Sequence, residues 1–215
     1  MPKRDNISMS VIRRLPRYYR FLHHLKSKGV KRISSKELSE KMGFTASQIR
    51  QDLNCFGGFG QQGYGYLVEQ LCEEMGNILG VSNRYRCILI GAGNLGQAIA
   101  SHLSFETQGF SLTGIFDNDP DKIGTTLNDL PIRDVSTLEQ FCWETRPVMA
   151  ILCVPRAAVE SLSDQLYAMG IKNFWNFSHY DIAMKYPDAI VENVHLNDSL
   201  MTLCYRISDR DSRPS

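Results

Sequence analysis

The chain of 215 residues is 43% hydrophobic and carries a net charge of +1, a composition that predicts one or two soluble globular domains. No run approaches the roughly 18 apolar residues of a membrane-spanning helix, no apolar segment follows the basic N-terminus as in a signal peptide, and the six scattered cysteines form no C-x-x-C pair. These cysteines favour a reducing cytoplasm over a disulfide or metal framework. The net charge hides an asymmetry, because residues 1–85 hold 14 Lys+Arg and 7 Asp+Glu, a net of +7, whereas residues 86–215 hold 10 and 16, a net of −6. A polyanion is therefore the expected partner of the basic part.

Three helical patterns fill the first part of the chain: residues 11–27, 34–42 and 45–56. Pro16 is expected near the start of the first, because proline is tolerated only in a first turn. A capping box from Ser34 begins the second. A similar box at Thr45, with Gln48 as its reciprocal partner, begins the third. Two short helices joined by a glycine turn predict a helix-turn-helix over about 17–56.

Glycines alternate with aromatic residues over 57–66, a pattern typical of a short β-hairpin. A hairpin after a helix-turn-helix indicates the wing of a winged helix, with Tyr64 and Tyr66 in the hairpin core. The alternative is a three-helix unit that serves only for packing. The third helix presents side chains of the types that read bases in the major groove. The residues expected to contact DNA are Arg13, Arg17, Lys36, Thr45, Ser47, Gln48, Arg50, Gln51 and Gln61.

A linking helix over 67–79 and a boundary at 80–84 separate this part from the next. The predicted domains are a winged-helix domain at 1–84, a dinucleotide-binding domain at 85–195, and a C-terminal helix and tail at 196–215. The second domain begins with a buried-strand pattern at 87–90, followed by G-x-G-x-x-G at 91–96 and a helical pattern. The glycines of such a turn allow a pyrophosphate to approach the backbone at the N-terminus of the helix.

A second strand pattern ends at Asp117, which lies 21 residues after Gly96. A carboxylate at this spacing binds the 2′-hydroxyl of the adenosine ribose, and it would repel a 2′-phosphate, so NAD(H) is preferred over NADP(H). The simpler interpretation is that Asp117 only forms a turn. An apolar run at 148–155, a helix at 156–169 and a strand at 171–177 complete a βαβα pattern, which predicts an α/β, doubly wound parallel sheet of the Rossmann type. The predicted cofactor contacts are Gly91, Ala92, Gly93, Asn94, Leu95, Gly96, Asp117, Asn118, Lys122, Val154 and Pro155.

A catalytic role is not expected. A dehydrogenase needs an acid or base near the nicotinamide, and the candidates His102, His179 and His195 lie in no recognisable motif. The sheet also leaves no residues for a substrate domain. An NAD-dependent oxidoreductase with a helical dimerisation arm nevertheless stays open as an alternative.

The whole pattern resembles the Rex family of redox-sensing transcriptional repressors. The segments that carry the resemblance are QIRQDLNCFGGFGQQGYGY (48–66), GAGNLG (91–96), IFDNDPDKIG (115–124), CVPRAAVE (153–160), GIKNFWNF (170–177) and VENVHL (191–196). The resemblance implies a homodimeric repressor that binds palindromic double-stranded operator DNA and is released by NADH. It also implies that the terminal helix, about Leu196–Ile207, is swapped between subunits. From the composition, no metal and no membrane partner is expected.

The resemblance further implies a redox-sensitive network of an Arg, a Tyr and an Asp. Arg20 matches the first, whereas His102 and His195 stand at the other two positions. Two histidines predict a response that depends on pH between about 6 and 8. The same replacements leave open a relative that binds NAD(H) without responding to redox state. Gln51 and Gln61 replace basic residues, so weak phosphate contact and a shallow salt dependence are expected, with Arg50 as the main DNA contact.

Overall fold

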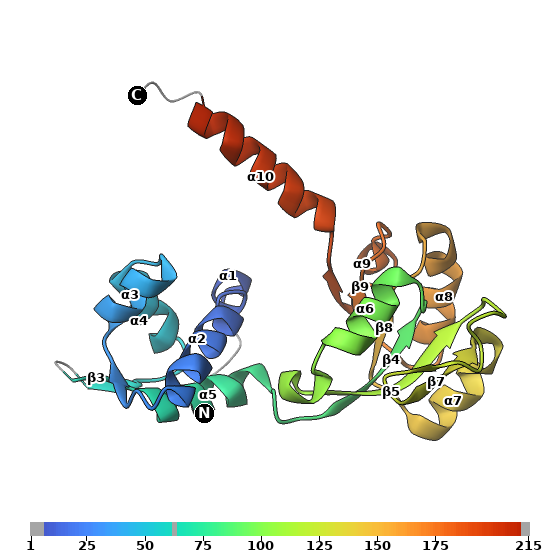
Figure 1. Ribbon diagram of the computed structural model, residues 1–215, viewed down its shortest axis with the longest axis horizontal. Helices are drawn as coiled ribbons and strands as arrows, with labels where there is room; N and C mark the ends of the chain where they lie inside the picture. The colour runs from blue at the N-terminus through green and yellow to red at the C-terminus, as the bar shows by residue number, and fades with distance from the viewer. Residues whose placement is uncertain (1–6, 62–63, 212–215) are drawn as a thin grey trace. The chain divides into compact units, whose positions relative to one another are not determined.

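A computed structural model describes residues 7–61 and 64–211, and the chain divides into two units, Met1–Ser82 and Asn83–Ser215 (Figure 1). The N-terminal unit contains five helices and three short strands within the described residues. They are α1 (Met9–Ile12), α2 (Leu15–Ser27), β1 (Arg32–Ile33), α3 (Ser35–Met42), α4 (Ala46–Asn54), β2 (Gly60–Gln61), β3 (Gly65–Leu67) and α5 (Val68–Leu79).

The starts of these helices follow local sequence signals. Pro16 lies in the first turn of α2, as predicted, but the chain ahead of it forms the separate short helix α1 and not a continuation of the same helix. Ser34 and Glu37 form the predicted capping box of α3. At α4 the prediction was half wrong. The Thr45 hydroxyl accepts from the Gln48 N–H at 3.1 Å, but the Gln48 side chain donates to Asp52 and does not return to the cap.

The wing is an antiparallel sheet in the order β1-β3-β2. The sequence did not predict β1, whose two residues pair with the far strand of the hairpin, Ile33 opposite Tyr66. Tyr66 is buried in the hairpin core as expected. The same expectation was wrong for Tyr64, which is 70% exposed because it precedes the first residue of β3 and lies outside the pleat. Residues 62–63 of the predicted wing lie outside the described residues, as does the side chain of Gln61.

One apolar core unites the helices of this unit. The buried stripe of α2, with Leu15, Tyr18 and Leu22, packs with Ile49 and Leu53 of α4 in a single cluster. Each of these side chains is at most 1% exposed. Burying a side chain of this size stabilises the folded unit by about 1.5–3 kcal/mol, so this core fixes the outward face of α4.

The C-terminal unit is built on a seven-stranded sheet in the order β10-β9-β8-β4-β5-β7-β6, parallel except for the β6–β7 pair. Figure 1 shows its strands side by side. Its elements are β4 (Tyr85–Ile90), α6 (Asn94–His102), β5 (Phe110–Asp117), β6 (Thr126–Leu127), β7 (Leu130–Asp134), α7 (Leu138–Thr145), β8 (Met149–Leu152), α8 (Arg156–Ala168), β9 (Asn173–Asn176), α9 (Ile182–Lys185), β10 (Ile190–Asn193) and α10 (Leu196–Asp211). Short 3-10 helices lie at Phe105–Gln108 and Val135–Thr137.

Both faces of the sheet are covered. Ile88 and Ile90 of β4 belong to a cluster with α7 and α8, whereas Leu89 belongs to a second cluster that contains Ile99 and Ala100 of α6. Strand side chains alternate between the two faces. Because both faces are buried, the strands have the near-continuous apolar sequences of a parallel sheet. The predicted fold is therefore confirmed, with β9 shorter than the expected strand.

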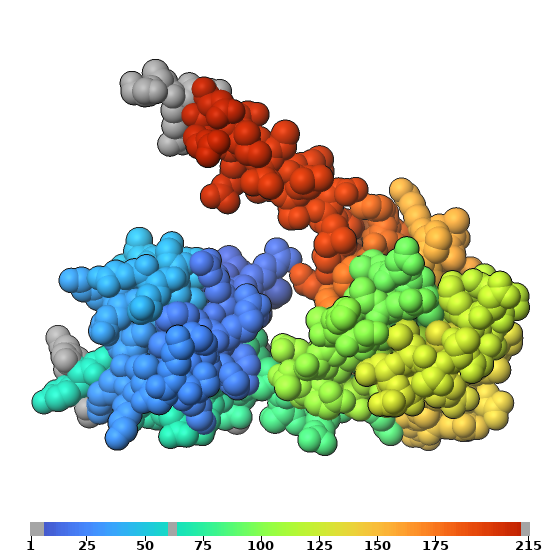
Figure 2. All heavy atoms as spheres, in the orientation of Figure 1, coloured from blue at the N-terminus to red at the C-terminus, as the bar shows by residue number. Residues whose placement is uncertain are grey.

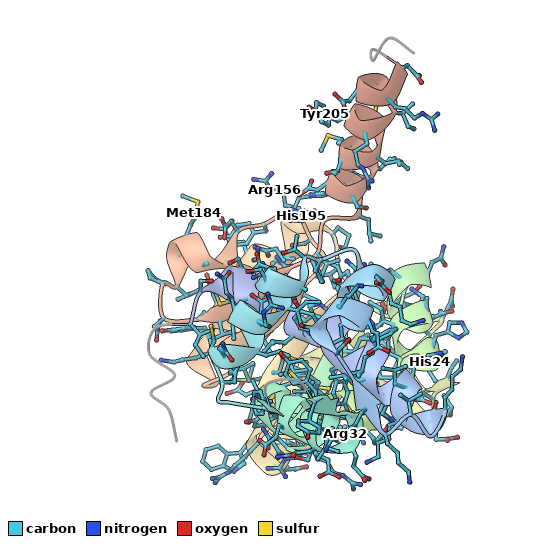
Figure 3. All side chains as sticks on the ribbon, turned by 90° about the vertical axis from the view of Figure 1, so that its left-hand side faces the viewer. His24, Arg32, Arg156, Met184, His195 and Tyr205 are labelled. Carbon is cyan, nitrogen blue, oxygen red and sulfur yellow. The ribbon has the colours of Figure 1, made fainter. Side chains whose placement is uncertain are left out.

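The terminal helix α10 extends to Asp211, one turn beyond the predicted end. None of its residues, Leu196–Asp211, is buried, and Figure 2 shows its side chains as a rod of exposed atoms. Its large apolar side chains, including Leu200 and Leu203, are 47–70% exposed, and Figure 3 shows Tyr205 projecting from the helix. Among the described residues, no helix is long and apolar enough to span a membrane.

Candidate functional site

The glycine turn lies where the order of the sheet reverses. From the central β4 the chain proceeds first to β5 and β7 on one side, and then to β8, β9 and β10 on the other. Ligands of doubly wound sheets bind outside the carboxyl ends of the strands at this switch point. Gly91, which follows β4, has φ +96° and donates its N–H to the carbonyl of Phe116 at 2.8 Å.

Each glycine of the turn meets a different constraint. A Cβ at Gly91 would lie 2.5 Å from the carbonyl oxygen of Cys153, and a Cβ at Gly96 would collide with the carbonyl oxygen of Gly91. These two glycines are required by packing. Gly93, the N-cap of α6, is different, because no heavy atom lies within 4 Å of the position of its Cβ. The turn therefore keeps open space beside a helix N-terminus, which fits the approach of a pyrophosphate to the backbone.

Asp117 ends β5 beside this turn and is 7% exposed. Its carboxylate accepts from the backbone N–H of Ala92 at 2.6 Å and of Asp119 at 2.9 Å, and the Lys122 ammonium lies 3.6 Å away. Lys122 also pairs with Asp119 at 3.0 Å, and this hydrogen bond raises the pKa of Lys122 and lowers the pKa of Asp119. The carboxylate of Asp117 thus has a fixed position and ties the turn to the second strand.

The segment after β8 also borders the carboxyl edge of the sheet. Cys153 donates its N–H to Ile90, and burial raises the pKa of its thiol to about 12. The half-buried Val154 and the exposed Pro155, the N-cap of α8, follow it. The structure therefore brings the predicted cofactor residues to one edge of the sheet, with Ala92 buried and Asn94, Leu95 and Asn118 exposed there.

The helix-turn-helix presents a polar outer face. Seven of the predicted DNA contacts are exposed: Arg13, Arg17, Lys36, Thr45, Ser47, Arg50 and Gln51. Arg50 donates to the Ser35 hydroxyl at 3.1 Å, which links α4 to the start of α3. Exposed Ser, Gln and Arg side chains on the second helix of this motif are suited to contact base edges and phosphates.

Two of the predicted DNA contacts, Arg17 and Gln48, also have partners within the protein. The Arg17 guanidinium donates to the Met42 carbonyl at 2.6 Å and lies 4.8 Å from the ring centroid of Phe44. It holds the turn between α3 and α4. The Gln48 amide donates to a carboxylate oxygen of Asp52 at 2.9 Å, so its orientation is fixed by the protein.

Asp52 is the centre of a polar network that sequence reasoning missed. Its carboxylate, 1% exposed, accepts two hydrogen bonds from Arg14, both at 2.7 Å, and one from the Tyr18 hydroxyl at 2.8 Å. Burial works to raise the pKa of Asp52, but the hydrogen bonds from Arg14, Gln48 and Tyr18 outweigh it, so the pKa is lowered. A buried carboxylate is stable only when it is paired in this way.

The predicted redox residues belong to both units. Arg20 is exposed on α2 in the N-terminal unit, and His102 is exposed at the last residue of α6. His195 follows β10, with its Nδ1 3.4 Å from an oxygen of Asp198 and its ring centroid 5.0 Å from that of His179. Sequence reasoning did not predict this contact, because it joins two separate strand ends. Within the described residues, no group of three or more His, Cys, Asp or Glu side chains is placed to hold a metal ion.

Comparison with known proteins gives full-length relatives. Residues 6–54 match the family model "Putative DNA-binding protein N-terminus", and residues 82–180 match "CoA binding domain". The chain is 54% identical over 211 residues to the redox-sensing transcriptional repressor Rex of Thermoanaerobacter pseudethanolicus, covering 98% of this chain and 94% of the relative. It is 52% identical over 211 residues to Rex of Clostridium perfringens, covering 98% and 99%.

Solved structures agree with these relatives. A crystal structure of the repressor RSP in complex with β-NAD⁺ and operator DNA matches with a TM-score of 0.89 and 54% identity, covering 97% of this chain and 95% of that one. RSP in complex with β-NADH matches with a TM-score of 0.86 and 51% identity, covering 95% and 96%.

Proposed function

This chain belongs to the Rex family of redox-sensing transcriptional repressors, and from that premise we propose that it binds palindromic operator DNA and releases it when NADH binds. The family predicted from the sequence is thereby confirmed. Its relatives are repressors and not enzymes, in agreement with the prediction that the chain has no catalytic role. The observation that carries the function is one chain with both a winged helix and a dinucleotide turn.

The DNA contacts are assigned to the exposed face of the helix-turn-helix. The first turn of α4 enters the major groove with Ser47 and Gln48, and Arg50 contacts a base or a phosphate. The exposed Arg17 is assigned to the same face, where it also holds the turn at Met42. Arg13, Lys36 and Thr45 lie on the exposed surface from which phosphate contacts come, and Gln51 and Gln61 complete the set.

The cofactor NAD(H) is assigned to the carboxyl edge of the sheet. The turn Gly91–Gly96 holds the pyrophosphate, and Asp117 accepts from the ribose, since each carboxylate oxygen retains acceptor capacity beside its backbone donor. Asn118 and Lys122 border the adenosine half, and Val154 and Pro155 border the nicotinamide half. Bound NAD(H) supplies the redox difference, because its nicotinamide ring is cationic when oxidised and neutral when reduced.

A coupling of modest size suffices for the switch. NADH changes DNA affinity only to the extent that it binds the two arrangements of the repressor differently. A tenfold to hundredfold loss of DNA affinity corresponds to about 1.4–2.8 kcal/mol, within the usual range of coupling energies. Arg20, His102 and His195 are the residues assigned to this response.

We assign a homodimer formed through α10, with exchange of this helix between subunits. The support is its row of exposed apolar side chains, including Leu196, Leu200 and Leu203. A palindromic operator matches a twofold-symmetric protein. The site of action is the cytoplasm, as the cysteine pattern indicated.

The test is fluorescence anisotropy of a labelled palindromic duplex, titrated with the protein alone, with NAD⁺ and with NADH. Release by NADH and not by NAD⁺ is expected. Tight binding that ignores both cofactors would indicate a relative with a blunted redox response, and the histidines at positions 102 and 195 are the specific reason to include that outcome. Failure to bind any duplex, combined with substrate-dependent NADH consumption, would favour an oxidoreductase.

A further inference from the structure

The carboxylate of Asp52 has no acceptor capacity left. One oxygen accepts from Arg14 Nε at 2.7 Å and from the Tyr18 hydroxyl at 2.8 Å. The other accepts from Arg14 Nη2 at 2.7 Å and from Gln48 Nε2 at 2.9 Å. A carboxylate offers about four lone-pair sites, so these four donors saturate it.

This saturation fixes which way the Gln48 amide points. The side chain of a glutamine ends in an oxygen that only accepts and a nitrogen that only donates. An ionised carboxylate also only accepts, so the amide cannot turn its oxygen toward Asp52 without leaving two acceptors face to face. The Gln48 nitrogen therefore stays on Asp52. Its second N–H and its carbonyl oxygen remain available on the half-exposed side of the residue.

The remaining donor and acceptor match one base. In the major groove adenine presents the N7 acceptor beside the N6 amino donor, whereas guanine presents two acceptors, N7 and O6. Gln48 is the third residue of α4, in the turn of the helix that reaches base edges. We propose that Asp52 is a positioning residue, which holds Gln48 in the orientation that selects adenine and rejects guanine at one position of each operator half-site.

The assignment rests on the proposed operator binding and specifies how it reads sequence. Gln51 provides the internal comparison, because it has the same side chain on the same helix and is exposed. Among the described residues, no carboxylate holds the Gln51 amide, so its amide is free to turn. A glutamine that can turn accepts either base pattern and discriminates weakly.

The experiment begins with a palindromic duplex selected by the wild-type protein from a randomised pool. Each half-site position is then changed symmetrically to the other base pairs, and DNA affinity is measured by anisotropy at one salt concentration. The wild type is expected to prefer adenine over guanine by about tenfold at one position, the size of a good bidentate contact. Gln48→Met, similar in length but without the amide, should reduce this preference below about twofold. Gln51 is itself an assigned DNA contact, so Gln51→Met should lower the overall DNA affinity while the adenine preference at this position persists.

Asp52→Asn tests the positioning role. An asparagine offers Gln48 either an oxygen or an amino group, so both amide orientations become possible, and the adenine preference should fall at the position that Gln48→Met identifies. Should this variant fail to fold, NMR of the wild type gives the answer instead. One Nε2 proton of Gln48, assigned by its absence in Gln48→Met, is expected to exchange with solvent more slowly than those of Gln51.

Three results would overturn the proposal: unchanged base preference in Gln48→Met, a folded Asp52→Asn that keeps the full preference, or Gln48 protons that exchange as fast as those of Gln51. A wild type that selects no duplex at all would instead refute operator binding itself, and this inference with it.

Discussion

Replacing Gly93 by alanine should weaken NADH binding while leaving the fold intact. The position has φ −74° and ψ −173°, which an alanine adopts without strain, and a methyl group there meets no heavy atom of the protein within 4 Å. Alanine reduces the freedom of the unfolded chain, which stabilises a protein by about 0.4–1 kcal/mol. It is also a poorer N-cap than glycine, by roughly 0.5 kcal/mol or more. The two effects offset, and the free energy of unfolding should change by less than about 0.5 kcal/mol.

The effect on the cofactor has no such compensation. The methyl group occupies the open space through which a pyrophosphate approaches the N-terminus of α6. A loss of at least tenfold in NADH affinity, about 1.4 kcal/mol, is expected. NADH fluorescence titration measures the binding, and thermal unfolding measures the stability. Gly58→Ala is the matched control, since that site is equally open and belongs to the other unit.

Gly96→Ala makes a useful contrast, because its methyl group would collide with the carbonyl oxygen of Gly91. Overpacking of this kind typically costs about 1–3 kcal/mol, so this variant should lose stability and NADH binding together. A folded Gly93→Ala protein that binds NADH within about twofold of the wild type would refute the role given to the turn.

Four further outcomes are expected. Arg50→Ala should lose at least about tenfold in DNA affinity with unchanged NADH binding, measured by anisotropy and by NADH fluorescence; equal losses in both would contradict a role confined to DNA. Because the pKa of Asp52 is lowered in the folded protein, its carboxylate adds to the free energy of unfolding at pH values above the ordinary carboxyl pKa of about 3.9. This contribution is lost as the pH falls through the lowered pKa of the folded protein. Thermal unfolding of Asp52→Asn should therefore depend less on pH in that acid range than the wild type. Iodoacetamide at about pH 8 should label the exposed Cys55 and spare Cys153, whose pKa is raised to about 12 by burial; rapid labelling of both, read by mass spectrometry, would argue against the packing around β8. The loss of DNA affinity caused by NADH should vary between about pH 6 and 8, and His195→Asp should reduce that variation. A loss of affinity that is the same across this range in the wild type would contradict a role for the histidines in the switch.

Signals that are local in sequence predicted the corresponding structure well. The capping box at Ser34 and the glycine turn at Gly91–Gly96 each depend on a few consecutive residues, and both form as expected. The prediction that Tyr64 is buried failed because the strand begins one residue later than expected. The strand that buries Tyr66 starts at Gly65, so Tyr64 lies outside it. The sequence near Ile207 contains no residue that marks a helix end, so the extra turn of α10 up to Asp211 could not be predicted.

The hydrophobic periodicity of the sequence does not predict contacts between residues that are far apart in the chain. Asp52 lies 38 residues from Arg14 and 34 from Tyr18, and nothing in the periodicity of either helix pairs them. An acid between the apolar residues Ile49 and Leu53 of α4 was the available signal, since a buried charge requires a partner. The contact of His195 with His179 likewise arises only when β9 and β10 pair in register.

The exposure of α10 has a consequence for how much repressor a cell needs. A helix of 16 residues is about 24 Å long, and isolated helices near 12–15 residues are only marginally formed in water. None of its residues is buried against its own chain, so in the proposed homodimer α10 depends on the partner subunit for its helicity, and assembly and ordering of this segment become one equilibrium. Such an equilibrium obeys mass action and shifts toward separate, partly unwound chains on dilution. In that dimer, operator occupancy depends on the number of repressor molecules per cell in addition to NADH.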